Sequence, residues 1–262
     1  MTSGPSPRAR LRAALAEGTP VTGTFVKLPA PDVVELCGLT GFDFVVVDLE
    51  HSTLTEADAI ALVRHADRCG LPALVRVPEV DAPLICRLLE NGAAGVQLSM
   101  LGSAAQARAL VRAARFAPDG ARSISLANRA AGFGLRASGG LKAFLAAERD
   151  DPPLLVGQVE TPWWRDGDPW DAVIGDLDVV FVGGTDLAVS LGADPGGEEL
   201  RAAVAEIEEA AARHGVAFGG WLPSGAAAHD HGLAGARYLV TGSDLQILAA
   251  GLEAAAGRGG NG

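Results

Sequence analysis

The run FDFVVVDLEHSTL, residues 42–54, joins a strongly strand-forming segment to a cluster of ionisable side chains. The three valines at 45–47 favour an extended backbone, because branching at Cβ suits a pleated strand. Asp48, Glu50 and His51 follow directly. A strand that is apolar on both faces and ends in two acids and a histidine is typical of a parallel sheet whose strand ends build a functional site.

Short apolar runs of this kind recur along the chain, separated by alanine-rich amphipathic stretches. Their apolar residues are continuous, as in strands that are covered on both faces. The predicted strands are residues 23–28, 42–49, 72–77, 94–99, 153–159, 178–183, 216–222 and 236–242. The helix-like segments between them are residues 31–41, 56–70, 82–92, 104–116, 198–215 and 225–235.

Eight strands with intervening helices predict a single α/β domain over residues 1–262, folded as a (β/α)₈ TIM barrel. The competing fold, a doubly wound sheet, normally carries a glycine-rich phosphate turn after its first strand. Here that position holds VKLPAPD, residues 26–32, which has no GxGxxG pattern. The barrel is therefore the preferred prediction.

Two stretches depart from the alternation of strands and helices. Residues 117–152 are rich in Gly, Arg and Ser and are too long for a plain connection, so we expect a functional or mobile loop. The tail near 257–262, GRGGNG, is expected to be disordered.

Composition narrows the class of function. A net charge of −11 argues against a nucleic-acid partner, and no run reaches the roughly 18 apolar residues of a membrane span. The three cysteines are scattered without a CxxC, and the N-terminus lacks the apolar core of a signal peptide. We expect a cytoplasmic protein that acts on small molecules, with no nucleic acid or membrane partner.

Polar residues gather where several predicted strands end. In a barrel of parallel strands these ends meet at one mouth, which is where active sites form. Four strands contribute, and packing alone does not explain so many polar ends. The residues concerned are Asp48, Glu50, His51, Arg76, Gln158, Glu160, Thr185 and Asp186.

Glu160 and Asp186 follow neighbouring strands, so their carboxylates are expected to meet. Two such groups repel unless one is protonated or a cation lies between them. Oxygen ligands suit Mg²⁺ or Mn²⁺, with Co²⁺ as a further option. The alternative is that each acid caps the next helix or pairs with an arginine.

His51 is the candidate general base, because imidazole titrates near neutral pH. Asp48, Glu50 or Glu90 would orient it; the alternative is a structural histidine. Arg76 stands within an apolar strand, so its guanidinium must find an anion there, either structural or part of a substrate.

Five segments in chain order resemble the HpcH/HpaI aldolase family, and the resemblance spans roughly residues 10–255. They are GTFVKLPAPDVVELCGLTGFDFVVVDLEH (23–51), LVRVP (74–78), QVET (158–161), VGGTDLAVSLG (182–192) and GARYLVTGSDLQIL (235–248). The resemblance implies a class II pyruvate aldolase of the 4-hydroxy-2-oxoheptanedioate or 2-keto-3-deoxy sugar acid type. The fold implied is a barrel of the phosphoenolpyruvate/pyruvate-domain type.

The resemblance also implies roles for individual residues and a set of partners. The metal ligands would be Glu160 and Asp186, and the catalytic residues His51 as base, Glu90 as its helper and Arg76 at the enolate oxygen. The residues contacting the keto acid would be Gln158, Gly184, Thr185 and Leu222. The substrates would be a 2-oxo acid and an aldehyde, and the chain would form a homo-oligomer, a trimer or hexamer, in which a C-terminal helix packs on a neighbour.

This sequence departs from the family pattern at several positions. Glu90 replaces the usual aspartate, Gly184 and Ser99 stand where proline is common, and Ser52 replaces glycine. The segment PWWRDGDPWD, 162–171, is unusually aromatic, so its tryptophans are either core residues or, as Trp163, contacts to a substrate.

These changes leave the metal and enolate residues intact but leave the electrophile open. The alternative functions are therefore another enolate-based lyase, a decarboxylase, a cyclisation catalyst, or a non-catalytic barrel that serves in binding or assembly.

Overall fold

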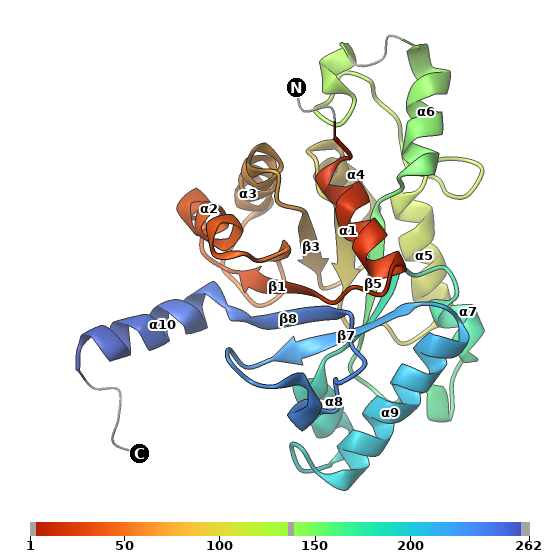
Figure 1. The fold of residues 1–262 in the computed structure, drawn as a ribbon. Coiled ribbons are helices and arrows are strands. Elements are labelled where there is room, and N and C mark those ends of the chain that lie inside the picture. The colour runs from red at the N-terminus through yellow and green to blue at the C-terminus, as the bar shows by residue number, and fades with distance from the viewer. Residues whose placement is uncertain (1–3, 136–138, 258–262) are drawn as a thin grey trace.

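The computed structural model describes residues 4–135 and 139–257, and it contains a closed barrel of eight parallel strands surrounded by helices (Figure 1). The predicted (β/α)₈ barrel is confirmed. Neighbouring strands pair in chain order, and β8 returns to β1 to close the barrel. The strands are β1 (Val21–Val26), β2 (Phe44–Asp48), β3 (Ala73–Val77), β4 (Gly95–Leu98), β5 (Leu154–Val159), β6 (Val179–Val182), β7 (Ala217–Leu222) and β8 (Tyr238–Ser243).

Helices connect the strands and cover the outside of the barrel (Figure 1). The α-helices are α1 (Pro7–Ala16), α2 (Pro31–Thr40), α3 (Glu56–Cys69), α4 (Ala82–Glu90), α5 (Ala104–Ala114), α6 (Gly140–Asp150), α7 (Trp170–Ile174), α8 (Gly184–Leu191), α9 (Glu198–Arg213) and α10 (Asp244–Ala255). Short 3₁₀ turns are η1 (Gly132–Gly134), η2 (Trp163–Arg165) and η3 (Ala228–His231).

Two predictions about the connections need correction. The helix expected at 225–235 is wrong, because only the 3₁₀ turn η3 forms between Gly225 and Gly232, both of which have left-handed backbone angles. The stretch 117–152 is not all loop, since α6 occupies its second half. The expected tail lies outside the described residues, apart from Gly257.

Alternation along the strands sorts the side chains into two apolar layers. In β2, Val45 and Val47 belong to the outer cluster, which lies between strands and helices. Phe44 and Val46 belong to the interior cluster, which lies inside the barrel. Because successive side chains point to opposite faces, Asp48 points inward above Val46. The inward position that ends this strand is therefore ionisable.

The amino end of the barrel is closed by apolar side chains. Leu11 and Leu15 of α1 are buried and belong to the interior cluster. The interior is thus apolar and capped at the end where the strands begin, which leaves the carboxyl end as the place for polar chemistry.

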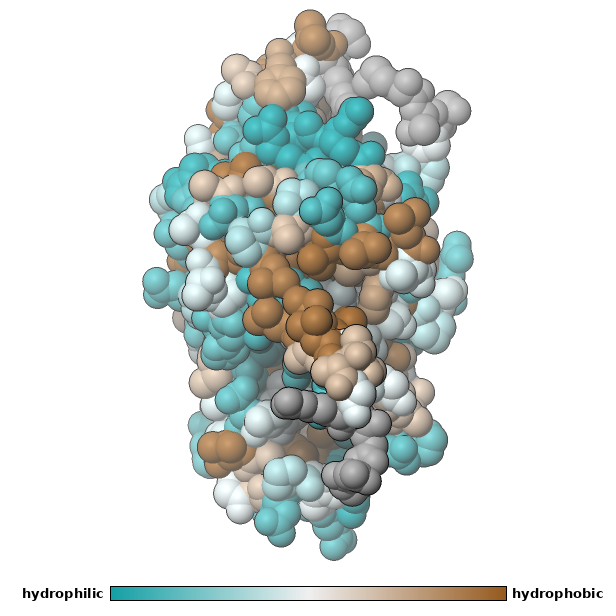
Figure 2. Space-filling model, turned by 90° about the vertical axis from the view of Figure 1, so that its left-hand side faces the viewer, coloured by the Kyte–Doolittle hydropathy of each residue, from teal (hydrophilic) through white to brown (hydrophobic). Residues whose placement is uncertain are grey.

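The C-terminal helix α10 extends away from the barrel (Figure 1). Asp244 is its one buried residue, and it accepts hydrogen bonds from the backbone N–H groups of Lys27 and Leu28, both at 2.9 Å. Figure 2 shows a hydrophobic band in the centre of the face from which α10 projects. The exposed apolar residues of this helix are Leu245, Ile247, Leu248 and Leu252. None of the helices in the described part of the chain is both long and apolar enough to cross a membrane.

At the centre of the interior cluster, the Phe44 ring packs directly against the backbone of β1 at Gly23. The rings of Phe44 and Tyr238 stack with centroids 4.4 Å apart, and both side chains are fully buried. A Cβ at Gly23 would lie 2.6 Å from two atoms of the Phe44 ring. Gly23 is therefore required by packing.

We expect Gly23→Ala to lower the free energy of unfolding by about 1–3 kcal/mol, because the added methyl displaces the Phe44 ring in a filled interior. Urea unfolding measures this. The matched control is Gly38→Ala on the exposed side of α2, where an added Cβ meets nothing within 4 Å. That variant should be neutral or more stable by up to about 1 kcal/mol, and equal effects of the two changes would contradict the packing argument.

Candidate active site

Polar side chains form the uppermost inward layer of the barrel. Asp48 pairs in register with Arg76, and Arg76 with Gln97 on the next strand. Gln158 and Glu160 follow the inward residue Val156 on β5 and are likewise buried. The prediction that polar strand ends converge holds for these residues, and the structure adds Gln97, which sequence reasoning missed.

Arg76 is held by two carboxylates. Its Nε donates to Asp48 Oδ1 at 2.9 Å, its Nη2 donates to Asp48 Oδ2 at 2.6 Å, and its Nη1 lies 3.2 Å from Glu50 Oε2. The guanidinium also lies over the ring of Phe25, 4.3 Å from its centroid. A guanidinium carries five N–H groups. The contacts above use three of them, so the others remain available to a ligand.

Asp48 serves as the anchor of the turn after β2. It is fully buried, and its Oδ1 accepts the backbone N–H groups of Glu50 at 3.0 Å and His51 at 3.2 Å. Burial raises the pKa of this carboxyl, but the hydrogen bond and charge of Arg76 and the two N–H donors outweigh burial and hold the pKa below its usual value. Asp48 is therefore an ionised structural group that sets where His51 stands.

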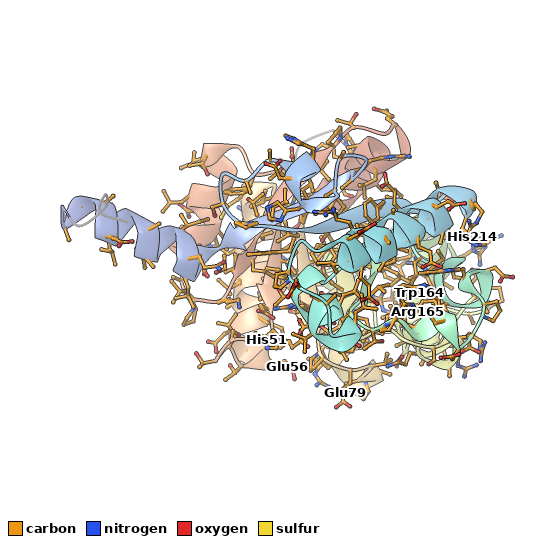
Figure 3. The ribbon with its side chains drawn as sticks, turned by 90° about the horizontal axis from the view of Figure 1, so that it is seen from below. His51, Glu56, Glu79, Trp164, Arg165 and His214 are labelled. Atoms are coloured by element: carbon orange, nitrogen blue, oxygen red, sulfur yellow. The ribbon has the colours of Figure 1, made fainter. Side chains whose placement is uncertain are left out.

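His51 is exposed, and its Nε2 lies 3.7 Å from Glu50 Oε2. Figure 3 shows His51 on the same side as α10, whereas His214 lies at the other end of the barrel. Glu90 ends α4, just before the amino end of β4, so in this chain it lies at the end of the barrel opposite His51. The expected pairing of Glu90 with His51 is not formed within one chain, and the carboxylate beside His51 is Glu50.

Glu160 is a buried carboxyl with two donors. Its Oε2 accepts the Met100 backbone N–H and its Oε1 accepts Gln158 Nε2, both at 2.7 Å. Met100 takes a left-handed backbone angle, φ 50°, which is strained for a residue with a side chain. A Cβ at Gly183 would lie 2.5 Å from Glu160 Cγ and 2.8 Å from Oε1. Glu160 is thus packed closely against the start of α8.

The pKa of Glu160 is raised to about 7. Burial is the largest cause of the rise. The N–H donors of Met100 and Gln158 lower the pKa, and the negative charges of Glu50 and Asp186 raise it further. The negative charge of Asp186 therefore disfavours the ionised form of Glu160.

A chain of hydrogen bonds crosses the barrel interior to Glu160. The Tyr238 hydroxyl donates to Gln97 Oε1 at 3.3 Å, Gln97 Nε2 donates to Gln158 Oε1 at 2.7 Å, and Gln158 Nε2 donates to Glu160. Each amide accepts on one side and donates on the other, which fixes its orientation. Sequence reasoning missed Tyr238 and Gln97, although Gln97 interrupts an apolar run and was visible for that reason.

The start of α8 supplies Asp186 and free backbone donors. Asp186 is exposed in the first turn, directly after Gly184 and Thr185. Gly183 precedes the helix without a capping side chain, and the first intrahelical bond at this end runs from Leu187 N to Gly183 O. The N–H groups before Leu187 are therefore available to an anion.

The charges in this layer do not balance. The layer and its rim hold four carboxyl groups and two cationic side chains, which leaves an excess of two negative charges when all are ionised, and such an excess fits one divalent cation. Carboxylate oxygens have lone pairs to spare after the hydrogen bonds above, so Glu160 and Asp186 fit a hard cation. The groups counted are Asp48, Glu50, Glu160, Asp186, Arg76 and Lys27, whose Nζ lies 3.3 Å from Asp48 Oδ2.

Two predicted substrate contacts lie elsewhere. Leu222 is buried in the outer cluster, because on β7 Trp221 packs on the interior cluster and the next residue points outward. Trp163 packs with Trp164 and Trp170 against the outer cluster. The ring centroids of Trp163 and Trp170 lie 4.7 Å apart. Figure 3 shows Trp164 well away from His51. The interpretation of these tryptophans as core aromatics is the one that the structure supports.

The family model, the curated relatives and the solved structures all relate this chain to one family of aldolases. The family model for HpcH/HpaI aldolase/citrate lyase matches residues 21–250. The chain is 32% identical to a 4-hydroxy-2-oxovalerate aldolase of Novosphingobium aromaticivorans, over 94% of this chain and 92% of that protein. It is 30% identical to a hydroxypyruvate/pyruvate aldolase of Paraburkholderia phytofirmans, over 91% and 92%. Its fold matches an HpcH/HpaI aldolase from Desulfitobacterium hafniense with a TM-score of 0.83 and 28% identity, over 94% and 95%.

The raised pKa of Glu160 predicts a pH dependence of stability in the metal-free protein. Because the folded-state pKa of about 7 exceeds the ordinary 4.5, the native state keeps a proton that the unfolded state releases, so stability falls as pH rises between these values. Relative to Glu160→Gln, wild type should lose roughly 2–3 kcal/mol between pH 5 and pH 8.

Urea unfolding in EDTA at both pH values measures this difference. Altered hydrogen bonds in Glu160→Gln change its free energy of unfolding by the same amount at both pH values, so they do not affect the difference in pH dependence. Parallel pH profiles for the two proteins would contradict the shifted pKa.

Proposed function

The chain belongs to the HpcH/HpaI aldolase/citrate lyase family and is a carbon–carbon lyase, and we propose that it is a metal-dependent class II aldolase. Its reaction would join or cleave a bond between the enolate of a 2-oxo acid such as pyruvate and an aldehyde. The observation that carries this proposal is the pair of carboxyls Glu160 and Asp186, to which the described residues supply no cationic partner, next to Glu50 and its ion-pair partner Arg76.

Glu160 and Asp186 would hold a divalent cation, Mg²⁺ or Mn²⁺, with Co²⁺ as an alternative. When bound, the cation supplies a Lewis acid that polarises the keto group of the substrate. Oxygen ligands alone favour these hard cations over softer ones. Gln158 orients one oxygen of Glu160 through its 2.7 Å hydrogen bond, so the carboxylate is held in place before the substrate arrives.

The remaining donors in the layer bind the oxygens of the 2-oxo acid. The free N–H groups of Gly184 and Thr185 suit the carboxylate, because a helix start attracts anions. Arg76 suits the keto oxygen, where negative charge grows as the enolate forms. Asp48 and Glu50 hold this guanidinium rigidly, so it needs no rearrangement during the reaction.

His51 is the general base of the proposed reaction. In the cleavage direction it accepts the proton of the C4 hydroxyl, directly or through water. The C3–C4 bond then breaks, an aldehyde leaves, and the enolate takes a proton at C3. Exposure of His51 lets it reach a substrate at the mouth, and Glu50 at 3.7 Å stabilises the imidazolium that forms.

We expect Asp186→Asn to reduce metal-dependent exchange of the C3 protons of pyruvate by at least about 100-fold, while the fold survives, because Asp186 is exposed. Deuterium exchange followed by NMR, with Mg²⁺ or Mn²⁺ against EDTA, measures enolate formation without an aldehyde. The matched control is Asp171→Asn, another exposed acid in the first turn of a helix, which should exchange at the wild-type rate.

A wild-type rate in Asp186→Asn with EDTA present would refute the metal role. Release of an aldehyde from a 4-hydroxy-2-oxo acid supports the aldolase reaction. Release of CO₂ without an aldehyde would instead point to a decarboxylase.

We also propose that the chain assembles into a homo-oligomer, a trimer or hexamer, through α10. Its exposed apolar residues extend from the barrel with little cover from their own chain. A second copy of the chain is the occupant that suits a helix anchored at one end by buried Asp244.

The double variant Leu248→Glu with Leu252→Glu should lower the mass in solution to that of the monomer, because the two charges cannot be buried unpaired. Light scattering after size exclusion measures the mass. The control is Leu141→Glu on α6, a similarly exposed leucine far from α10, which should keep the wild-type mass. An unchanged mass in the double variant would exclude α10 from the interface.

A further inference from the structure

A second group of metal-ligating side chains lies on the outside of the barrel. In the described residues, Glu35 of α2 and His65 and Cys69 of α3 bring one potential ligand atom each to within 4.8 Å of one another. His65 Nε2 and Glu35 Oε1 already meet at 2.8 Å. The proposed reaction does not use these residues.

The position of this group follows from the helix geometry. His65 and Cys69 are four residues apart on α3 and therefore share one face of the helix. Glu35 faces them from α2, which packs beside α3 (Figure 1). Cys69 and Glu35 are exposed, and His65 is half-buried. All three are thus reachable by an ion from solvent.

The ligand set selects a different class of cation from the active site. Thiolate and imidazole suit Zn²⁺ and cations of similar preference, whereas Mg²⁺ and Mn²⁺ prefer oxygen. Zinc bonds of about 2.0–2.3 Å place tetrahedral ligands closer together than 4.8 Å, so binding requires a contraction of about 1 Å. Exposed side chains at the end of α3 can make such a change by rotation.

We propose that Glu35, His65 and Cys69 form a binding site for Zn²⁺ or a cation of similar preference, separate from the active site. Three protein ligands leave one position open. Glu35 and Cys69 also line a cavity of about 600 Å³ at the amino end of the barrel, beside Leu11 and Phe42, so water or a small ligand reaches the open position. A bound ion links α2 to α3 at the end of the barrel opposite His51.

Cobalt titration tests this site in the full-length protein, with excess Mg²⁺ to occupy oxygen-only sites. Wild type should develop a near-ultraviolet thiolate-to-cobalt charge-transfer band that saturates at one equivalent and disappears when Zn²⁺ is added. Cys69→Ser should abolish the band, and His65→Ala should weaken cobalt binding by at least about 10-fold.

Two controls separate this site from other thiols and from the active site. Cys86→Ser changes a half-buried cysteine outside the group and should keep the band, as should Glu160→Gln, which alters the proposed catalytic site. Absence of the band in wild type, or its persistence in Cys69→Ser, overturns the proposal. This result is independent of whether the aldolase reaction is confirmed.

Thiol labelling gives a second test that does not depend on a variant folding. In wild-type protein Zn²⁺ should slow modification of Cys69, identified by peptide mapping, and leave that of Cys86 unchanged. Equal labelling of Cys69 with and without Zn²⁺ would also overturn the proposal.

Discussion

The buried pairing of Arg76 with Asp48 is the interaction on which the rest of the site depends. A guanidinium in the barrel interior is costly unless carboxylates neutralise it, and Asp48 does so through two hydrogen bonds while it also fixes the turn that carries Glu50 and His51. Asp48 therefore determines both the direction of the Arg76 guanidinium and the position of His51, the proposed base.

The buried Arg76–Asp48 pair lies between an apolar layer beneath it and further ionisable groups above it. Interior residues such as Val46 and Leu74 exclude water beneath Asp48 and Arg76, which strengthens every electrostatic interaction in the layer. The same exclusion raises the pKa of Glu160. The layer thus gathers carboxylates whose mutual repulsion the proposed divalent cation would offset.

Much of this was predictable from strand periodicity and from the properties of strand ends. Arg76 was predicted because a guanidinium in an apolar strand needs an anion, and Gln158 because it stands near the end of a predicted strand. The outward direction of Leu222 follows from counting alternate positions along β7, but the sequence does not show where the strand begins. Glu90 already stood near the end of the predicted helix 82–92, so its distance from His51 within one chain was predictable from barrel geometry; the pairing was expected only because of the family resemblance. Contacts that depend on backbone shape, such as Met100 N with Glu160, leave no trace in residue type.

The hydrogen-bonded amides between Glu160 and Tyr238 give the protein a built-in reporter for magnetic resonance. Tyr238 is the one tyrosine in the chain, so its phenol signal is free of overlap from other residues of its kind. Because its hydroxyl donates to the far end of the amide chain, a change of charge at Glu160 polarises each link in turn and reaches the ring. Events at the mouth can thus be followed from the floor of the barrel without attaching a label.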